Sequence, residues 1–327
     1  MSYALFYCAR PQYGGWVTFT AHMALKYELD LHKVGNRTEV KADGSLWLRD
    51  FGYGARYQNI APKDVKQVAQ KKKILITAID KNYYDSLPSF PDGTYIVIHD
   101  PTEVTPQKLQ TLGQHLKRFR ILTIRQSVSD YLSKLGYKSK FIIHPFYEYK
   151  FQKAPNPTKT VSISRIDYDK HTDILIDANK HLPQTKKIDI YGALNRMYAF
   201  HKLQNTDFKK YYKGGFEKSF EELSKKLADV KFVADMSVIK FDGGGTQYTF
   251  LEAIHQGCAL IINQAWISGY KSVFKPGVNC FAVEDGKELA ELIIKNPSTT
   301  AIQKGADKIL APHLKVNWPK EMDSWHS

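Results

Sequence analysis

The sequence has few cysteines and no long apolar run. Its three cysteines, Cys8, Cys258 and Cys280, stand singly, with no CxxC pair and no histidine cluster at ligand spacing. We therefore expect neither a disulfide framework nor a structural zinc site. No stretch of about 18 apolar residues occurs, so no membrane-spanning helix is expected. The first residues lack the basic region of a signal peptide, so we expect a strand there and a cytoplasmic protein.

Acidic residues are scarce relative to basic ones. The 327 residues include 47 Lys/Arg and 33 Asp/Glu, which gives a net charge of +14. Residues 101–150 alone hold nine basic and three acidic side chains. This bias favours a polyanionic partner such as nucleic acid, or an anionic membrane surface. A solvated lysine-rich surface is the alternative explanation, and charge alone does not choose between them.

Short apolar runs alternate with helical segments in two successive arrays. This alternation predicts an α/β protein with two Rossmann-like domains facing each other across a cleft. We place the N-terminal domain at residues 1–146 and the C-terminal domain at residues 147–327, with the tail, residues 313–327, as a candidate to pack back on the N-terminal domain. The expected strands include residues 3–9, 73–79, 94–99, 120–124, 140–144, 160–164, 187–191, 230–238, 258–262 and 280–283.

A glycine-rich stretch at residues 242–257, DGGGTQYTFLEAIHQG, lies between two of these strands. Three glycines run into a helix that is expected to carry Glu252 in its first turn. Glycines permit close approach of a ligand, and a helix start offers unpaired N–H groups, so the stretch predicts a phosphate site. The alternative is a capping box made by Thr249 and Glu252, which binds nothing.

Two further polar segments follow strands in the N-terminal half. Gly14 and Gly15 stand before a helix expected from Val17, where doubly wound sheets often bind ligands. His99 and Asp100 end the strand at residues 94–99. The alternative for His99 and Asp100 is a strand-end Asp-Pro turn beside a histidine whose hydrogen bonds are satisfied.

The C-terminal half resembles the nucleotide-sugar-binding domain of glycosyltransferases with the GT-B fold. Its matching segments are residues 164–170 (SRIDYDK), 188–192 (IDIYG), 214–216 (GGF), 220–223 (FEEL) and 249–257 (TFLEAIHQG). The resemblance implies that Arg165 and Lys170 hold the donor diphosphate, that the glycine loop adds backbone N–H groups, and that Glu252 accepts hydrogen bonds from ribose hydroxyls. A solvated pair at a strand end is the alternative for Arg165 and Lys170.

The family pattern is not complete here. Many retaining members have a second Glu eight residues before the one that matches Glu252, and position 244 is Gly. Asp242 is the candidate to take that role. No dedicated metal or other cofactor is implied. The resemblance and the glycine segments together give these donor-binding candidates: Gly14, Gly15, Arg165, Lys170, Gly243, Gly244, Gly245, Thr246, Tyr248, Thr249 and Glu252.

Short matches in both halves look like the bacteriophage DNA α-glucosyltransferases, which modify 5-hydroxymethylcytosine. They include residues 8–10 (CAR), 15–18, 98–100 (IHD) and 248–252. The likeness implies that Asp100 lies near the anomeric carbon, with His99 as a hydrogen-bond partner. If the protein is viral, the cytoplasm in which we expect it is that of the host. Charge and aromatic content then suggest these nucleic-acid-binding residues, with a plain exposed surface as the alternative: Arg49, Arg56, Lys117, Arg118, Arg120 and Arg125.

The expected function is that of a retaining glycosyltransferase. It would move a sugar from a nucleoside-diphosphate donor, UDP-linked, to 5-hydroxymethylcytosine in viral double-stranded DNA. One rival keeps the chemistry and takes a glycan or lipid acceptor. A second rival is a non-catalytic nucleotide or nucleic-acid binder on the same scaffold, which the glycine at position 244 favours.

Overall fold

The computed structural model describes residues 2–10, 14–215, 217–239, 243–268 and 271–325. The chain divides into two compact units. The N-terminal unit comprises Met1–Glu148 and His313–Ser327, and the C-terminal unit comprises Tyr149–Pro312. The second division falls within helix α12 (Thr300–Lys315).

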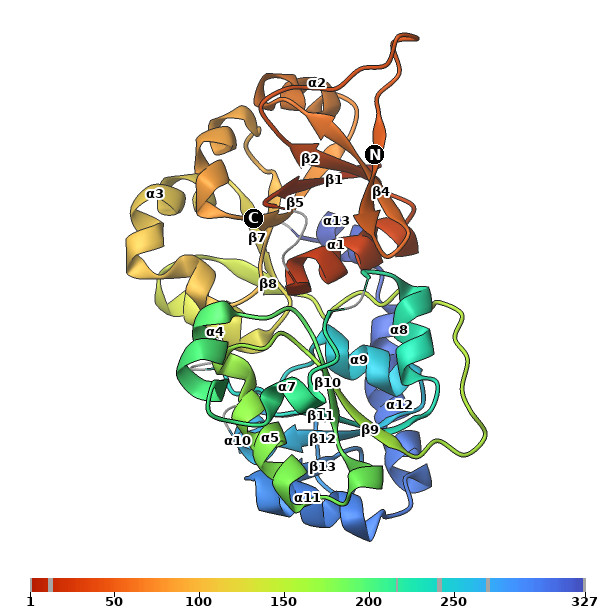
Figure 1. The fold of residues 1–327 in the computed structure, drawn as a ribbon. Helices are drawn as coiled ribbons and strands as arrows, with labels where there is room; N and C mark the ends of the chain where they lie inside the picture. Colours follow the sequence, from red (N-terminus) through yellow and green to blue (C-terminus); the bar gives the residue numbers. More distant parts are fainter. Residues whose placement is uncertain (1, 11–13, 216, 240–242, 269–270, 326–327) are drawn as a thin grey trace. The chain divides into compact units, whose positions relative to one another are not determined.

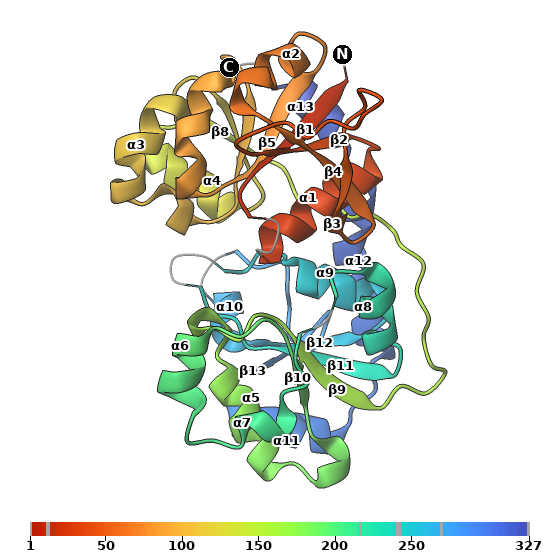
Figure 2. The same ribbon diagram turned by 45° about the horizontal axis from the view of Figure 1, so that its top comes forward.

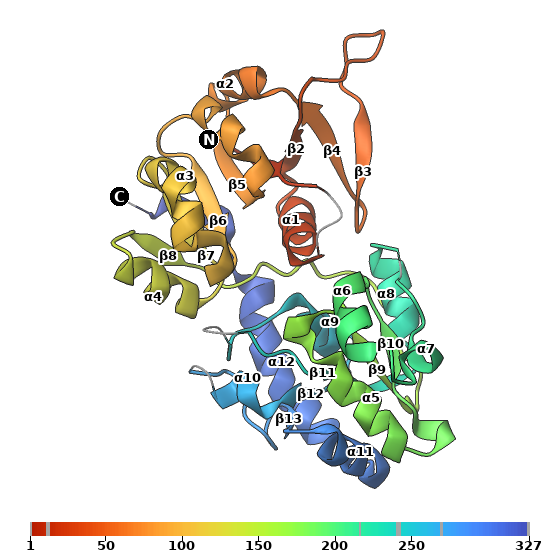
Figure 3. The same cartoon turned by 60° about the vertical axis from the view of Figure 1, so that its left-hand side comes forward.

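The N-terminal unit is built on an eight-stranded sheet with strand order β3-β4-β2-β1-β5-β6-β7-β8. Among the described strands of this sheet, only the β3–β4 pair is antiparallel, and it forms a hairpin at the edge of the sheet (Figure 3). Parallel strands need crossover connections, which explains the helices between them. The strands are β1 (Tyr3–Cys8), β2 (Asp30–Val34), β3 (Leu48–Gly52), β4 (Ala55–Ile60), β5 (Lys73–Ile79), β6 (Tyr95–Ile98), β7 (Arg120–Thr123) and β8 (Ser139–Phe141).

Helices cover the sheet of the N-terminal unit, and the end of the chain contributes one of them (Figure 1). The helix α13 (Trp318–Asp323) buries Trp318, whose ring meets Phe19 edge-on at 5.3 Å between centroids. The hydroxyl of Tyr95 donates to the carbonyl of Met322 at 2.8 Å. The other helices and helical turns are α1 (Gly14–Lys26), η1 (Pro62–Asp64), α2 (Val65–Ala69), η2 (Lys81–Ser89), η3 (Pro101–Val104), α3 (Pro106–Leu116) and α4 (Gln126–Lys134).

The C-terminal unit has a five-stranded, fully parallel sheet in the order β10-β9-β11-β12-β13. Figures 1 and 2 show helices on both of its faces, which is the doubly wound arrangement. Its strands are β9 (Lys159–Ile163), β10 (Asp189–Tyr191), β11 (Val230–Asp235), β12 (Ala259–Asn263) and β13 (Phe281–Val283). Its helices include α5 (Thr172–His181), α6 (Arg196–Tyr198), η6 (Ala199–Leu203), α7 (Phe208–Tyr211), α8 (Phe220–Leu227), α9 (Tyr248–His255), α10 (Gln264–Ser268) and α11 (Gly286–Lys295).

Local sequence accounts for several helix ends in this unit. Ser219 caps α8 by accepting from the amide of Glu222, and Lys225 and Lys226 lie in the last turn of that helix, where the dipole favours cations. Asp285 caps α11, and Asn296 ends it in the left-handed conformation. These signals place helix boundaries without tertiary information.

The α/β class and the two sheets predicted from the sequence are confirmed. The strand at β5 was expected at the residues where it lies. The first helix begins at Gly14 and not at Val17, so the expected glycine loop is in part the first turn of α1. The short helices α7 and α10 were not predicted. Cys8, Cys258 and Cys280 are free and buried. Among the described residues, no helix has the length and apolar character that crossing a membrane requires.

Candidate functional site

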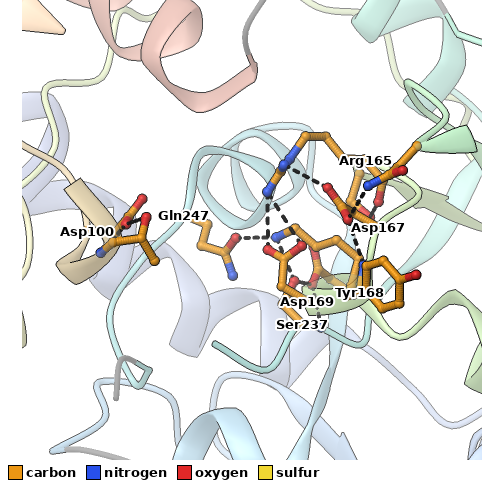
Figure 4. A network of polar contacts seen from close by, with 12 residues as sticks. Asp100, Arg165, Asp167, Tyr168, Asp169, Ser237 and Gln247 are labelled. Atoms are coloured by element: carbon orange, nitrogen blue, oxygen red, sulfur yellow. Dashed lines mark hydrogen bonds and ion pairs between the residues drawn. The ribbon is translucent and has the colours of Figure 1, made fainter. Parts of the chain in front are cut away.

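Lys170 lies in a buried polar cluster at the carboxyl end of β9. It closes the helical turn η4 (Tyr168–Lys170), and only 7% of its surface is exposed. Its Nζ donates to Oγ of Ser237 at 2.7 Å and to Oε1 of Gln247 at 2.9 Å. Figure 4 shows both partners beside the η4 turn. Because three separate segments supply these groups, the ammonium has a fixed position.

Arg165 lies two residues after β9 and is half exposed. Its guanidinium pairs with Asp167 at 3.0 Å and with Asp169 at 3.2 Å (Figure 4). Asp167 also accepts from the amide of Tyr168 at 2.8 Å. The Asp-Tyr-Asp sequence therefore orients the arginine. Within the described parts of the chain, no cluster of three or more His, Cys, Asp or Glu side chains is arranged to hold a metal ion.

A carboxylate lies behind the lysine. Asp235 ends β11, is 1% exposed, and accepts through Oδ1 from both the amide and the hydroxyl of Ser237. The Ser237 hydroxyl in turn accepts from Lys170, so one hydroxyl links the carboxylate to the ammonium. The sequence reasoning missed Asp235, Ser237 and Gln247. The sequence signal for Asp235 and Ser237 was the polar Asp-Met-Ser segment at the end of an apolar strand, and Gln247 lies within the glycine-rich stretch.

The glycine loop is anchored on α10. A Cβ on Gly243, whose φ is +154°, would lie 2.9 Å from the carbonyl oxygen of Trp266. The amide of Gly244 donates to that same oxygen at 2.7 Å, and the carbonyl of Gly245 accepts from the Trp266 indole at 3.1 Å. The amide of Gly244 is therefore already bonded within the protein, and the predicted donor contacts of the loop stay a prediction. Asp242, the candidate for the missing carboxylate, lies outside the described residues.

Helix α9 starts differently from the capping-box alternative. Its N-cap is Gln247, and no side chain caps it, so Thr249 is the second helical residue and no capping box forms. Glu252 lies in the second turn and not in the first. It is 7% exposed, and desolvation raises its pKa to about 8. Glu252 and Thr249 line a small hollow with apolar neighbours, while Thr246 and Tyr248 are buried nearby in sequence.

Gly192, at the end of β10, fixes the chain next to Arg165. Its φ is +150°, and a Cβ there would lie 1.7 Å from the carbonyl oxygen of Ser164. No side chain fits at that distance. The glycine matched in the sequence is thus required by packing against the neighbouring strand end.

His99, at the end of β6, is buried in the N-terminal unit. Its Nε2 lies 2.7 Å from the carbonyl oxygen of Thr77, which can only accept, so Nε2 carries the proton. Phe19 packs edge-on to its ring at 5.0 Å. Desolvation lowers the pKa of His99 to about 4, so the imidazole is neutral at pH 7.

Asp100 is partly exposed and caps the turn η3. Its Oδ1 accepts from the amide and the hydroxyl of Thr102. This is the geometry of the strand-end turn that the sequence offered as the alternative. A catalytic part for Asp100 and His99 stays a prediction.

Gly14 and Gly15 are exposed and open the 13-residue helix α1. A Cβ on Gly15 would meet nothing within 4 Å. Gly15 differs from Gly192 and Gly243, because no packing around it requires glycine. Helix α1 presents its N-terminal amides at Gly14 and Gly15, and their predicted donor contact stays a prediction.

The six predicted nucleic-acid-binding residues do not form one group. Arg120 begins β7 and bonds the Tyr95 hydroxyl at 2.8 Å, and Arg118 pairs with Asp92 at 2.6 Å. Both, with the exposed Lys117, lie at the amino ends of the strands. Arg125 follows β7 at the carboxyl ends, the opposite edge of the sheet.

Arg49 and Arg56 lie on the β3–β4 hairpin. Arg49 pairs with Glu39 at 2.5 Å, and Arg56 donates to the carbonyl of Leu48 at 3.0 Å. Arg49 and Glu39 line an open groove with Arg37, Thr38, Val40 and Trp47. The hairpin is therefore a second, separate basic region of the N-terminal unit.

The two sheets, parallel except for the β3–β4 pair, and the polar groups at their strand ends define a class of fold. The solved structures that resemble the chain over its whole length have the GT-B fold of two Rossmann-like domains, and this chain has that fold. No protein-family model and no curated protein sequence matches it.

Three solved structures illustrate the likeness. Alr3699/HepE from Anabaena, solved with UDP and glucose, has a TM-score of 0.69 at 16% identity, with 96% of this chain and 95% of that one covered. An alpha-glucosyltransferase solved with UDP-glucose and DNA containing an abasic site has a TM-score of 0.64 at 14% identity, with 98% of both chains covered. The pneumococcal O-GlcNAc transferase GtfA has a TM-score of 0.56 at 13% identity, with 88% of this chain and 66% of that one covered.

Proposed function

We propose that the protein is a glycosyltransferase that uses a UDP-linked sugar. The observation that carries this proposal is the placement of Lys170 and Arg165 after the carboxyl end of β9, where Lys170 bonds Gln247, the residue between the glycine loop and helix α9. Ligands of open α/β sheets bind at that edge. The neighbours solved with UDP, UDP-glucose or UDP and GlcNAc support the same donor.

The C-terminal unit would bind the donor. Lys170 would meet the diphosphate as a fixed point charge, and Arg165 would exchange its aspartate partners for phosphate oxygens. Glu252 would accept from the ribose hydroxyls, which favours its ionised form. Together the two cations offset the negative charge that grows on the departing diphosphate.

The reaction we propose retains the configuration of the sugar. The bond from the anomeric carbon to the diphosphate oxygen breaks while the acceptor oxygen adds on the same face. The acceptor's proton passes to the departing diphosphate, so no covalent enzyme intermediate is needed. The described residues would act by position and charge, with Asp100 and His99 near the acceptor.

The acceptor we propose is 5-hydroxymethylcytosine in double-stranded DNA. Support comes from the net charge of +14 and from the neighbour that was solved with DNA. A carbohydrate acceptor is the second candidate, because HepE, to which the chain is at least as similar as to the enzyme solved with DNA, was solved with glucose as well as UDP.

The test is to incubate the protein with UDP-sugars and duplex DNA containing either cytosine or 5-hydroxymethylcytosine. The DNA is then digested to nucleosides, which are weighed by mass spectrometry. We expect a gain the size of one sugar on the hydroxymethylated base alone. UDP binding without any gain in nucleoside mass would keep the proposed donor site and make a carbohydrate the proposed acceptor. No UDP binding would overturn the proposal.

A further inference from the structure

An exposed apolar and cationic surface follows β10 in the C-terminal unit. We call residues 194–210 the β10 surface. Met197 and Phe200 are each 59% exposed and stand three residues apart on the helical stretch formed by α6 and η6. Figure 2 shows α6 at the rim of this unit. Residues three apart on a helical stretch lie on one face, so Met197 and Phe200 form one exposed apolar surface, a feature that interaction sites use.

The stretch is held firmly from its other side. Asn195 caps α6 by accepting from two amides, and Tyr198 and Leu203 are buried. The hydroxyl of Tyr198 donates to Asp173 on α5 at 2.8 Å. Met197 and Phe200 therefore point outward from a fixed scaffold. The π-helical geometry of η6 is itself of a kind often found at functional sites.

Unneutralised cations surround these two side chains in the sequence. Residues 193–213 contain five basic residues and a single acidic one, Asp207. Among the described residues, Lys213 pairs with Asp189, and none of the ion pairs involves the other four. This differs from Arg49, Arg118 and Arg165, which all pair with carboxylates. The four cations are Arg196, Lys202, Lys209 and Lys210.

We propose that the β10 surface binds double-stranded DNA. Arg196 and Lys202 would contact backbone phosphates, and Met197 and Phe200 would act as an apolar wedge against the base steps. Proteins that bend or open DNA combine these elements, since wedges of Met, Phe or Leu unstack bases while cations hold the backbone. The inference deepens the proposed acceptor, because an enzyme that modifies a base in a duplex must expose that base.

An anionic membrane is the competing partner, and the structure favours DNA over it. Interfacial helices bury a continuous apolar face along many residues. Here α6 and η6 together span Arg196–Leu203 and expose two large apolar side chains, Met197 and Phe200. Two exposed apolar side chains suit a wedge between base steps better than a membrane anchor.

The experiment measures binding of a fluorescent 20-base-pair duplex at 50 to 200 mM salt. For Arg196→Gln/Lys202→Gln we expect the slope of log K against log salt to become shallower by about 2, one unit for each lost phosphate contact. For Met197→Ser/Phe200→Ser we expect binding at least fivefold weaker with the slope unchanged. The matched controls on α11 are Lys287→Gln/Lys295→Gln and Ile294→Ser, whose side chains are also exposed.

The outcomes separate this inference from the proposed function. Unchanged duplex binding in both surface variants overturns the inference, even if the wild type transfers sugar to DNA. Loss of duplex binding in the variants but not in the controls supports it, even if no transfer occurs. Binding to vesicles with 30% phosphatidylglycerol that the variants lose, with duplex binding retained, assigns the surface to a membrane instead.

Discussion

The carboxyl ends of β9 and β6 carry similar sequence patterns but different hydrogen-bond arrangements. After β9, Lys170 is held by side chains of Ser237 and Gln247, which come from two other segments. After β6, Asp100 is satisfied within its own turn by the amide and hydroxyl of Thr102, and His99 bonds the backbone carbonyl of Thr77 on the neighbouring strand β5. The first arrangement fixes a charge at the sheet edge, and the second shapes a turn.

The difference has an energetic meaning. Removing an ammonium from water is costly, so burial of Lys170 is tolerated only with polar groups placed around it. Capping a turn with Asp100 stabilises the chain locally and needs no distant group. The two strand ends thus suggest a criterion. A polar residue such as Lys170, held by side chains from distant segments, points to a binding site, whereas one such as Asp100, bonded to a residue two positions away, points to a turn.

The largest effect that would sharpen this comparison is expected for Gly192→Ala. The added Cβ would lie 1.7 Å from the Ser164 carbonyl, and φ is +150°, so the strand end must move. We expect a loss of about 3 kcal/mol or more in the free energy of unfolding. Urea unfolding measures this loss.

Gly15→Ala is the matched control for Gly192→Ala. Its new Cβ meets nothing within 4 Å, and alanine is the better helix former in α1. Equal stability of the two variants would show that Gly192 does not constrain the end of β9.

Lys170→Ala tests whether the buried ammonium binds the donor. Hydrogen bonds to charged groups contribute about 1.5–3 kcal/mol, so we expect UDP binding to weaken at least tenfold by calorimetry. Lys180→Ala is the control, because its ammonium is exposed and pairs only locally with Asp177. Wild-type affinity in Lys170→Ala would make Lys170 structural and would remove the contrast between the two strand ends.

The buried carboxyl group of Glu252 should make the stability of the protein depend on pH. Its pKa is raised to about 8 in the fold by desolvation, so the native state keeps a proton that the unfolded chain loses above about 4.5. Stability should therefore fall as pH rises from about 4.5 to 8, by at most about 1.4 kcal/mol per pH unit. Glu252→Gln should flatten this fall, which thermal unfolding between pH 5 and 8.5 measures.

Donor binding should show the opposite pH trend. The proposed contact has ribose hydroxyls donating to an ionised Glu252, so UDP affinity of the wild type should rise from pH 5 to 8 with release of a proton. Calorimetry in buffers of different ionisation enthalpy detects that proton. A stability profile of the wild type that matches Glu252→Gln would show that the carboxyl group is not desolvated.

The strands could be predicted from the sequence because burial on both faces makes parallel strands continuous apolar runs. Residues 73–79 illustrate this, since the predicted strand and β5 coincide. Arg165 and Lys170 were singled out by a resemblance to a family motif, and their donor-binding role stays a prediction. The strands needed only physical information within about ten residues.

The partners of Lys170 could not be predicted in this way. Ser237 and Gln247 are 67 and 77 residues away in the chain, and no local pattern links them to the lysine. The glycines show the same limit. The sequence does not distinguish Gly192 from Gly15. Only the tertiary packing around Ser164 shows that glycine is required at position 192.

Asp100 gives the smallest expected effect on stability and the sharpest test of the β6 strand end. Asp100→Ala removes the cap of η3 and should cost about 1 kcal/mol, whereas Asp100→Ser keeps a capping oxygen and should cost a few tenths. The proposed role near the anomeric carbon predicts that turnover falls in both variants with UDP affinity unchanged. Wild-type turnover in Asp100→Ser, with a loss in Asp100→Ala, would assign Asp100 to the turn alone, because serine restores the cap but not the carboxylate.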